Sequence, residues 1–318
     1  MTAASNASFG DRLRTVIDER GHLCVGIDPH PFLLERWNLA DSGQGAREFG
    51  LRVVDAAAGR VGIVKPQNAF FERFGAAGYA ALEDVLAAAR AAGLLVIADV
   101  KRGDVGTSVE AYGQAWLTPG SPLESDAMTI SAFQGVGSIA APMDLALSSG
   151  KGLFVLAATS NPEAARIQLA RTYRGTGQDQ AEQSPATPTA PPTETPTVAR
   201  VIIEDVMNYN AKQARGSHGA QGAVGSIGVV LGATLDLVDY GIDVAVAPQP
   251  GLPVLAPGFG HQGARVADAP RIYGALLANA VISDSRGLLS AGPNGIAVAI
   301  DNRNAELSAV AELGRTVG

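Results

Sequence analysis

Eight short apolar runs divide this chain at regular intervals, and amphipathic, Ala/Leu-rich segments lie between them. Continuous apolar runs of this length are typical of buried parallel strands, while Ala76–Ala92, Gly135–Leu147 and Val198–Ala214 have helical periodicity. We expect strands at His22–Ile27, Val61–Lys65, Leu94–Asp99, Ala127–Ile130, Gly152–Ala157, Ile227–Leu231, Pro253–Ala256 and Val281–Ser283. Eight strand–helix units predict a single α/β domain, residues 1–318, folded as a (β/α)8 TIM barrel. The alternative, a doubly wound open sheet, is weakened because no Gly-x-Gly-x-x-Gly follows the first strand.

One segment, Gly175–Thr197, interrupts the alternation of strands and helices. It contains no large apolar residue and is rich in Pro, Thr, Gln and Ala. Such a composition cannot bury enough surface to offset the entropy of ordering, so we predict a disordered surface insertion. It falls between the fifth and sixth strands, where a tolerated loop expansion is favoured over an active-site lid.

Composition restricts the class of function. A net charge of −7 argues against a nucleic-acid or anionic membrane surface. No apolar run approaches the roughly 18 residues that a membrane span needs. The single cysteine, Cys24, lies in the first expected strand, so no intrachain disulfide is possible and a reduced, cytoplasmic setting is expected.

The third expected strand ends in a cluster of charges, Asp99-Val-Lys101-Arg-Gly-Asp104. Asp99 and Lys101 point the same way on a regular strand, about 6.6 Å apart. Charges at the end of a buried strand are costly unless they pair or act on a ligand. Lysine is also scarce, with four Lys against 20 Arg. Of these two residue types, only lysine can release a proton near neutral pH. The cluster therefore indicates either a proton-transfer site or an ordinary ion pair.

The last two strands are followed by a different kind of loop. Pro257–Gly263 is rich in glycine, which exposes backbone N–H groups, and Arg286 follows the eighth strand. Barrels commonly bind phosphate at these two loops, so we predict a phosphate site there. The alternative is that the glycines only form turns.

Other catalytic constellations are weaker. The histidines, His22, His30, His218 and His261, lack metal-ligand spacing. Carboxylates alone could hold Mg²⁺, but Lys65 and Lys101 balance the charge of Asp99 and Asp104. No Gly-x-Ser-x-Gly elbow is present, which weakens a serine hydrolase. We therefore predict no metal.

In order along the chain, the motifs VGIDPHP, VKPQNAFFERFG, DVKRGDVGTS, SAFQG, TSNPE, PGFGHQGA and SRGLLSAG resemble orotidine 5′-phosphate decarboxylases, in particular their longer bacterial subclass. The resemblance covers nearly the whole chain outside the insertion. It implies decarboxylation of a nucleotide, orotidine 5′-phosphate, to UMP in pyrimidine biosynthesis, without metal or cofactor.

The resemblance also implies roles for individual residues. Lys101 would protonate C6 of the pyrimidine, Asp99 would lie beside the substrate carboxylate, and Lys65 would hold Asp99 and the ribose. Asp104 would enter the site of a neighbouring subunit, which requires a homodimer. The substrate-binding residues implied are Asp28 and Thr107 or Ser108 for the ribose, Ser160 or Asn161 for the pyrimidine, and Gly260, Gln262 and Arg286 for the phosphate.

Three rivals remain at this stage. A Mg²⁺-dependent sugar-phosphate decarboxylase or aldolase of the same suprafamily would carry a carboxylate where Lys65 stands, and a lysine there repels a dication. A Schiff-base aldolase would use Lys101 as its nucleophile. A non-catalytic nucleotide-binding protein would bind UMP without turnover.

Overall fold

The computed structural model describes residues 7–172, 195–216 and 223–316, and its centre is a closed barrel of eight parallel strands. Each strand pairs with the next along the chain, and β8 closes the barrel against β1. The strands are β1 Leu23–Ile27, β2 Ile63–Pro66, β3 Leu95–Arg102, β4 Ala127–Ile130, β5 Gly152–Ala158, β6 Ile227–Leu231, β7 Val254–Pro257 and β8 Ala280–Asp284. The predicted TIM barrel is confirmed, and seven of the eight strands end within one residue of their predicted ends.

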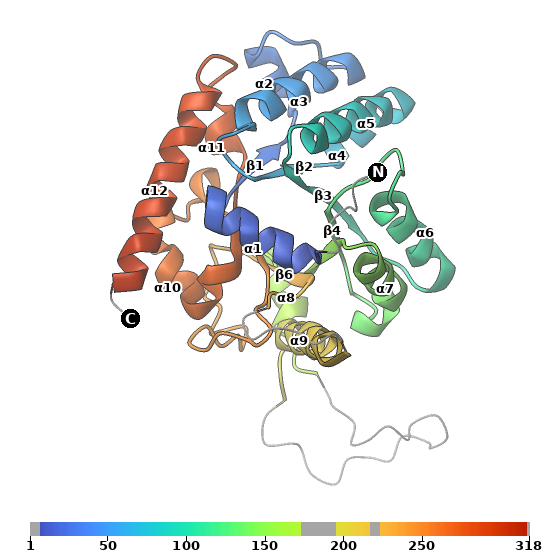
Figure 1. Cartoon of the computed structure of the whole chain (residues 1–318), viewed down its shortest axis with the longest axis vertical. Coiled ribbons are helices and arrows are strands. Elements are labelled where there is room, and N and C mark those ends of the chain that lie inside the picture. The colour runs from blue at the N-terminus through green and yellow to red at the C-terminus, as the bar shows by residue number, and fades with distance from the viewer. Residues whose placement is uncertain (1–6, 173–194, 217–222, 317–318) are drawn as a thin grey trace.

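Helices surround the barrel on its outer face (Figure 1). The helices described, of which α1 lies at one end of the barrel, are α1 Phe9–Arg20, α2 Pro31–Arg36, α3 Gly43–Ala57, α4 Ala69–Glu72, α5 Gly75–Ala91, α6 Gly106–Leu117, α7 Ala140–Ser148, α8 Ala165–Gln168, α9 Val198–Gly216, α10 Ala269–Tyr273, α11 Arg286–Leu289 and α12 Ile296–Thr316. Short 3₁₀ turns are η1 Val136–Ile139, η2 Pro162–Ala164, η3 Gly260–Gln262, η4 Val266–Asp268 and η5 Gly274–Asn279. None of the helices described is long and apolar enough to cross a membrane.

The expected helix at Gly135–Leu147 is wrong as a continuous element, because the structure has η1 followed by α7. Gly135, at φ 91°, begins the turn, and Pro142 stands in the first turn of α7. Proline has no N–H to donate to the fourth residue before it, so an α-helix cannot run unbroken through this point. The expected helices over α5 and α9 are confirmed to within two residues.

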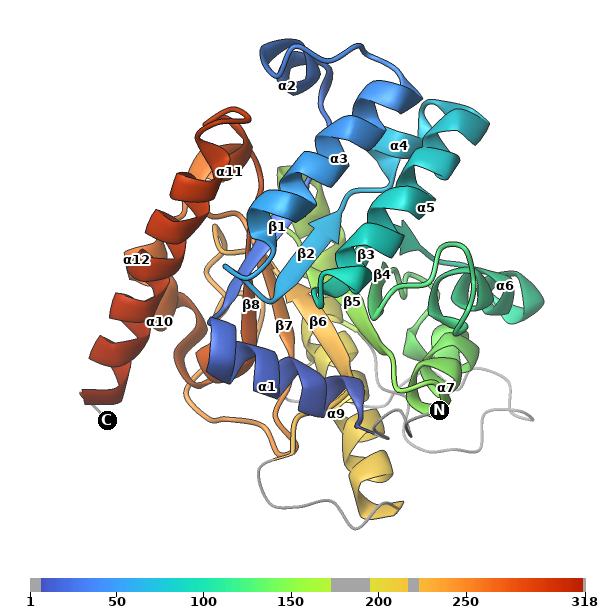
Figure 2. The same cartoon turned by 45° about the horizontal axis from the view of Figure 1, so that its top comes forward.

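Helix α1, which the sequence analysis did not predict, closes the amino-terminal end of the barrel (Figure 2). Its apolar residues Phe9, Leu13 and Ile17 pack with the barrel interior, where Phe9 meets Phe154 edge-on at 6.0 Å between ring centroids. Gly152 leaves room for this ring, since a Cβ there would lie 2.3 Å from Phe9. Helix α1 therefore covers this end of the interior in the described part of the chain, which leaves the carboxyl ends of the strands as the open side for a ligand.

Most of the predicted insertion, residues 175–194, lies outside the described residues. The chain on either side of residues 173–194 is well tied together. Arg171 and Thr197 form an antiparallel bridge, and the N–H of Thr172 donates to the carbonyl of Pro196 at 2.9 Å. Thr197 is buried, so residues 195–197 belong to the folded body and not to the insertion.

Candidate active site

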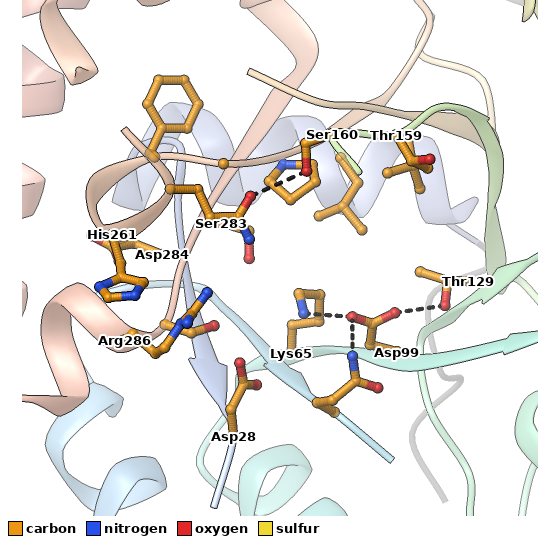
Figure 3. A pocket seen from close by; sticks show the side chains of 18 of the residues that line it. Asp28, Lys65, Asp99, Thr129, Thr159, Ser160, His261, Ser283, Asp284 and Arg286 are labelled. Atoms are coloured by element: carbon orange, nitrogen blue, oxygen red, sulfur yellow. Dashed lines mark hydrogen bonds and ion pairs between the residues drawn. The ribbon is translucent and has the colours of Figure 1, made fainter. Parts of the chain in front are cut away.

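A cavity of about 290 Å³ opens at the carboxyl ends of the strands (Figure 3). Lys65, Asp99 and Thr129 lie on one side of it, and His261, Asp284 and Arg286 on the other. The predicted site residues that line this cavity are Asp28, Lys65, Asp99, Lys101, Ser160 and its alternative Asn161, Gln262 and Arg286. The fold therefore brings together residues contributed by β1, β2, β3, β5, β7 and β8 or by the loops that follow them.

Asp99 is the centre of a charged hydrogen-bond array. Its Oδ2 accepts from Lys65 Nζ at 2.8 Å and from Gln67 Nε2 at 3.1 Å. Its Oδ1 accepts from Lys101 Nζ at 2.6 Å and from the hydroxyl of Thr129 at 2.9 Å. Both oxygens of the carboxylate thus have two donors, which makes the array strong and fixes its direction.

The array carries a buried negative charge between two positive ones. The Asp99 and Lys65 side chains are 9% and 7% exposed, whereas Lys101 is 46% exposed and faces the cavity. Burial by itself would raise the pKa of Asp99, but the ammoniums of Lys65 and Lys101 outweigh it and hold that pKa well below its usual range. Burial would likewise lower the pKa of Lys65, and the carboxylates of Asp99 and Asp28 raise it instead. Both groups are therefore charged at neutral pH.

Lys101 is placed by an irregularity in β3. Ala98 pairs with Met128 and Arg102 with Ile130, so three residues of β3 lie opposite the single residue Thr129 of β4. Lys101 has φ 47°, a left-handed conformation that costs a non-glycine residue about 1–3 kcal/mol. Such bulges redirect side chains near active sites. The predicted strand end at Asp99 is thus wrong by three residues, and regular alternation does not explain how Lys101 reaches Asp99.

The opposite side of the cavity contains the predicted phosphate loops. Arg286 and Gln262 both line the cavity, and Gln262 Oε1 accepts from the hydroxyl of Ser160 at 3.2 Å. Gly258, at φ 116°, also lines it, in a conformation that favours glycine. Gly260 does not line the cavity, and it packs instead against the Asp284 carboxylate.

Three further predicted residues lie apart from the cavity of their own chain. Asp104, Thr107 and Ser108 stand at or just before the start of α6, and none of them lines the cavity. Thr107 and Ser108 are exposed, and Asp104 Oδ1 accepts from the N–H of Val105 at 2.9 Å.

The structure adds cavity residues to which the sequence analysis gave no role, among them Thr129, Gln67, Ser283 and Asp284. Gln67, Ser283 and Asp284 are polar residues at the carboxyl end of a predicted strand or directly after it, so position alone could have found them. Thr129 stands inside the short apolar strand β4, and nothing in the sequence shows that it faces the bulge.

No group of three or more His, Cys, Asp or Glu side chains suited to a metal ion occurs among the described residues. Asp28 and Asp99 both line the cavity, but the Asp99 oxygens already accept from two ammoniums. A dication there would have to displace Lys65 or Lys101 against charge repulsion.

Fold and site together define a (β/α)8-barrel enzyme whose cavity has a Lys–Asp–Lys array on one side and Arg286 on the other. The sequence pattern of the orotidine 5′-phosphate decarboxylase / HUMPS family matches residues 21–299, and the chain belongs to this family. The chain is 45% identical over 292 residues to an orotidine 5′-phosphate decarboxylase of Salinispora tropica, covering 92% of this chain and 93% of that one. The relative in Streptomyces coelicolor, with the same name, is 45% identical over 288 residues, which cover 90% and 91% of the two chains.

A solved structure is similar over almost the full length. The crystal structure of a candidate orotidine 5′-phosphate decarboxylase from Streptomyces avermitilis superposes with a TM-score of 0.82 at 41% identity. It covers 98% of this chain and 98% of that one.

Proposed function

We propose that this chain decarboxylates orotidine 5′-phosphate to UMP, with Lys101 as the proton donor. The observation that carries the proposal is the Lys101 ammonium, held 2.6 Å from Asp99 and facing the cavity. The names of the bacterial relatives support the same substrate.

The layout of the cavity supports one orientation of the nucleotide. The phosphate lies at Arg286 and Gln262, where a guanidinium and an amide can bind it. The ribose lies near Asp28 and Lys65, and Ser160 faces the pyrimidine. The carboxylate on C6 then lies at the Asp99–Lys101 end of the cavity, away from the phosphate.

The reaction breaks the bond between C6 and its carboxylate. Carbon dioxide leaves, the electron pair stays on C6, and a proton moves from Lys101 Nζ to C6 to give UMP. The resulting amine regains a proton from water, to which the half-exposed Lys101 has access. A fixed ammonium stabilises charge that develops on C6 only in the transition state, so it raises kcat more than substrate affinity.

Asp99 and Lys65 set the electrostatics of this step. The Asp99 carboxylate stays ionised because Lys65 and Lys101 lower its pKa, so it keeps the Lys101 ammonium aimed at one point. Phosphate contacts on the far side contribute binding energy that orients the ring without touching the reacting carbon.

The first test is direct. Purified protein with excess EDTA is incubated with orotidine 5′-phosphate, and the ultraviolet spectrum is followed. We expect conversion to the UMP spectrum, together with a loss of kcat of about 10²–10⁴-fold for Lys101→Ala at nearly unchanged UMP affinity. No conversion, with turnover of a sugar phosphate once Mg²⁺ is restored, would move the chain to the metal-dependent members of its suprafamily. Near-normal turnover by Lys101→Ala would show that Lys101 is not the proton donor.

We further propose a homodimer in which Asp104 and one of Thr107 and Ser108 complete the site of the partner. Asp104 is half-buried, Thr107 and Ser108 are exposed, and none of the three lines the cavity of its own chain. Exposed apolar side chains stand in the same part of the sequence, with Val105 52%, Tyr112 38% and Phe133 76% exposed. Exposed apolar groups are typical of an interface, which a second copy would cover.

Mixing two inactive variants tests the shared site. Lys101→Ala and Asp104→Ala homodimers are unfolded together and refolded, or co-expressed with different tags. If Asp104 acts across the interface, the mixed dimer has one intact site, and random mixing restores about one quarter of the sites. Mixed dimers without recovered activity would show that Asp104 does not act across the interface.

The proposed setting is the cytoplasm. Cys24, the single cysteine of the sequence, is a buried free thiol in β1. Burial raises its pKa to about 12, so it stays protonated and unreactive. Detection of the native protein in a cytosolic fraction, and its absence from the medium, tests this placement.

A further inference from the structure

Asp284, the last residue of β8, lies beneath the proposed phosphate cradle and has no role in the chemistry described above. Its side chain is 1% exposed, and it lines the cavity next to Ser285 and Arg286. A buried carboxylate next to a site for an anion is unfavourable on charge alone. Asp284 must therefore contribute to the structure of the site in a way that outweighs this repulsion.

Two loops converge on the Asp284 carboxylate. Burial raises the pKa of this carboxyl, and the backbone N–H groups of Gly287 and Ser285, on the two sides of Arg286, oppose the rise. A Cβ on Gly287 would lie 2.7 Å from Oδ1, and a Cβ on Gly260 would lie 3.3 Å from both oxygens. Only glycine at these two positions lets the β7 and β8 loops approach the carboxylate so closely.

A third element balances the charge. Arg303 on α12 places Nη2 3.3 Å from Asp284 Oδ2, an oxygen that has no hydrogen bond among the described residues. Arg303 is itself only 20% exposed and also approaches Glu306, on its own helix, at 3.3 Å. Burial raises the pKa of Asp284, and the Arg303 charge opposes this rise.

We propose that Asp284, held by Arg303, is a positioning residue for the phosphate cradle. Its carboxylate orients the Ser285–Gly287 backbone, and through it Arg286, and fixes Gly260 against the same point. α12 thereby becomes part of the phosphate site without touching the ligand. This inference rests on the proposed function only in placing the phosphate of the nucleotide at Arg286.

Asp284→Asn separates positioning from simple electrostatics. The substitution keeps the shape and removes the negative charge, so electrostatics alone predicts tighter phosphate binding. Positioning predicts the opposite, because an amide accepts the two backbone N–H groups weakly and cannot pair with Arg303. We expect the dissociation constant of UMP to rise about tenfold, with that of uridine unchanged. Equal or tighter UMP binding would overturn the proposal.

Arg303→Met provides the second variant, with Arg60→Met as its matched control. Arg60 also forms an ion pair at α12, with Asp301 at 3.4 Å, but Asp301, unlike Asp284, does not line the cavity. We expect Arg303→Met to weaken UMP binding about tenfold without changing the affinity for uridine. Arg303→Lys should restore most of the affinity for UMP, and Arg60→Met should leave that affinity unchanged. A lower melting temperature with an unchanged ratio of uridine to UMP affinity would show a purely structural role for Arg303.

The wild type distinguishes the two possible failures. If it binds UMP no more tightly than uridine, the phosphate site of the proposed function is wrong. If it prefers UMP, and neither Asp284→Asn nor Arg303→Met changes that preference, the positioning role alone is wrong.

Discussion

The backbone N–H of Lys101 donates to the side-chain oxygen of Thr129 at 2.9 Å, so a hydroxyl on β4 holds the bulge of β3. The same hydroxyl donates to Asp99 Oδ1 at 2.9 Å. Thr129 therefore sets both the backbone position of Lys101 and the direction of the carboxylate that Lys101 contacts. Because Lys101 has a left-handed backbone, the bulge needs such support to persist.

Thr129→Val is expected to lower kcat about tenfold with little change in KM, because it removes one hydrogen bond to each partner and keeps the volume. Steady-state kinetics on orotidine 5′-phosphate measures this split. Thr129→Ser keeps the hydroxyl and should recover most of the loss. A valine variant with wild-type kcat would mean that the bulge holds Lys101 without Thr129.

Acid stability should depend on Asp99. Its folded pKa lies below the unfolded value of about 3.9, so its contribution is fully present above that pH and is lost as pH falls through the folded pKa. Urea unfolding at a series of pH values should therefore show the wild type losing stability below about pH 4, by at most about 1.4 kcal/mol per pH unit from this one group. The Asp99→Asn variant should be less stable than the wild type at pH 5, and its stability should fall less steeply below pH 4.

The matched control for Asp99 is Asp18→Asn. Asp18 belongs to a surface ion pair with Arg14, in which the two side chains are 54% and 47% exposed. Exposed pairs contribute little, so this variant should follow the wild-type profile. If both variants flatten the profile equally, the acid sensitivity does not come from the buried array.

The barrel and much of the site could be predicted because their signals are local. A buried parallel strand is a continuous apolar run, and polar residues at its carboxyl end face one common surface. The bulge at Lys101 could not be predicted, since it arises from the pairing of β3 with β4 and not from the sequence of β3. Thr129 and Arg303 were missed for the same reason: each acts on a residue that is distant in the chain, Arg303 on Asp284. The role of α1 could not be predicted either, because it depends on the barrel interior that α1 closes.

Arg286→Ala should selectively weaken the binding of phosphorylated ligands. Loss of charge-assisted hydrogen bonds is expected to raise the dissociation constant of UMP by about 10- to 100-fold and to leave uridine unchanged. Titration calorimetry with both ligands measures the difference. Arg265→Ala is the control, because Arg265 is exposed after the same β7 loop and does not line the cavity. Equal losses for UMP and uridine would place the phosphate elsewhere.

The segment 173–194 should be dispensable for the barrel and its chemistry. The chain that flanks it is already joined by the Arg171–Thr197 bridge, and Arg171 Nη1 donates to the carbonyl of Thr195 at 2.8 Å. Thr197 is further fixed by a hydrogen bond from its hydroxyl to the carbonyl of Tyr240.

Replacing residues 173–194 by a short Gly/Ser turn therefore closes a connection whose ends already meet. Shortening a loop changes its closure entropy by only about 0.6 kcal/mol per halving of its length. We expect kcat, KM and the melting temperature to remain close to wild type. A large rise in KM with an unchanged melting temperature would assign the segment a role at the substrate site, whereas a fall in melting temperature alone would show that it supports α9.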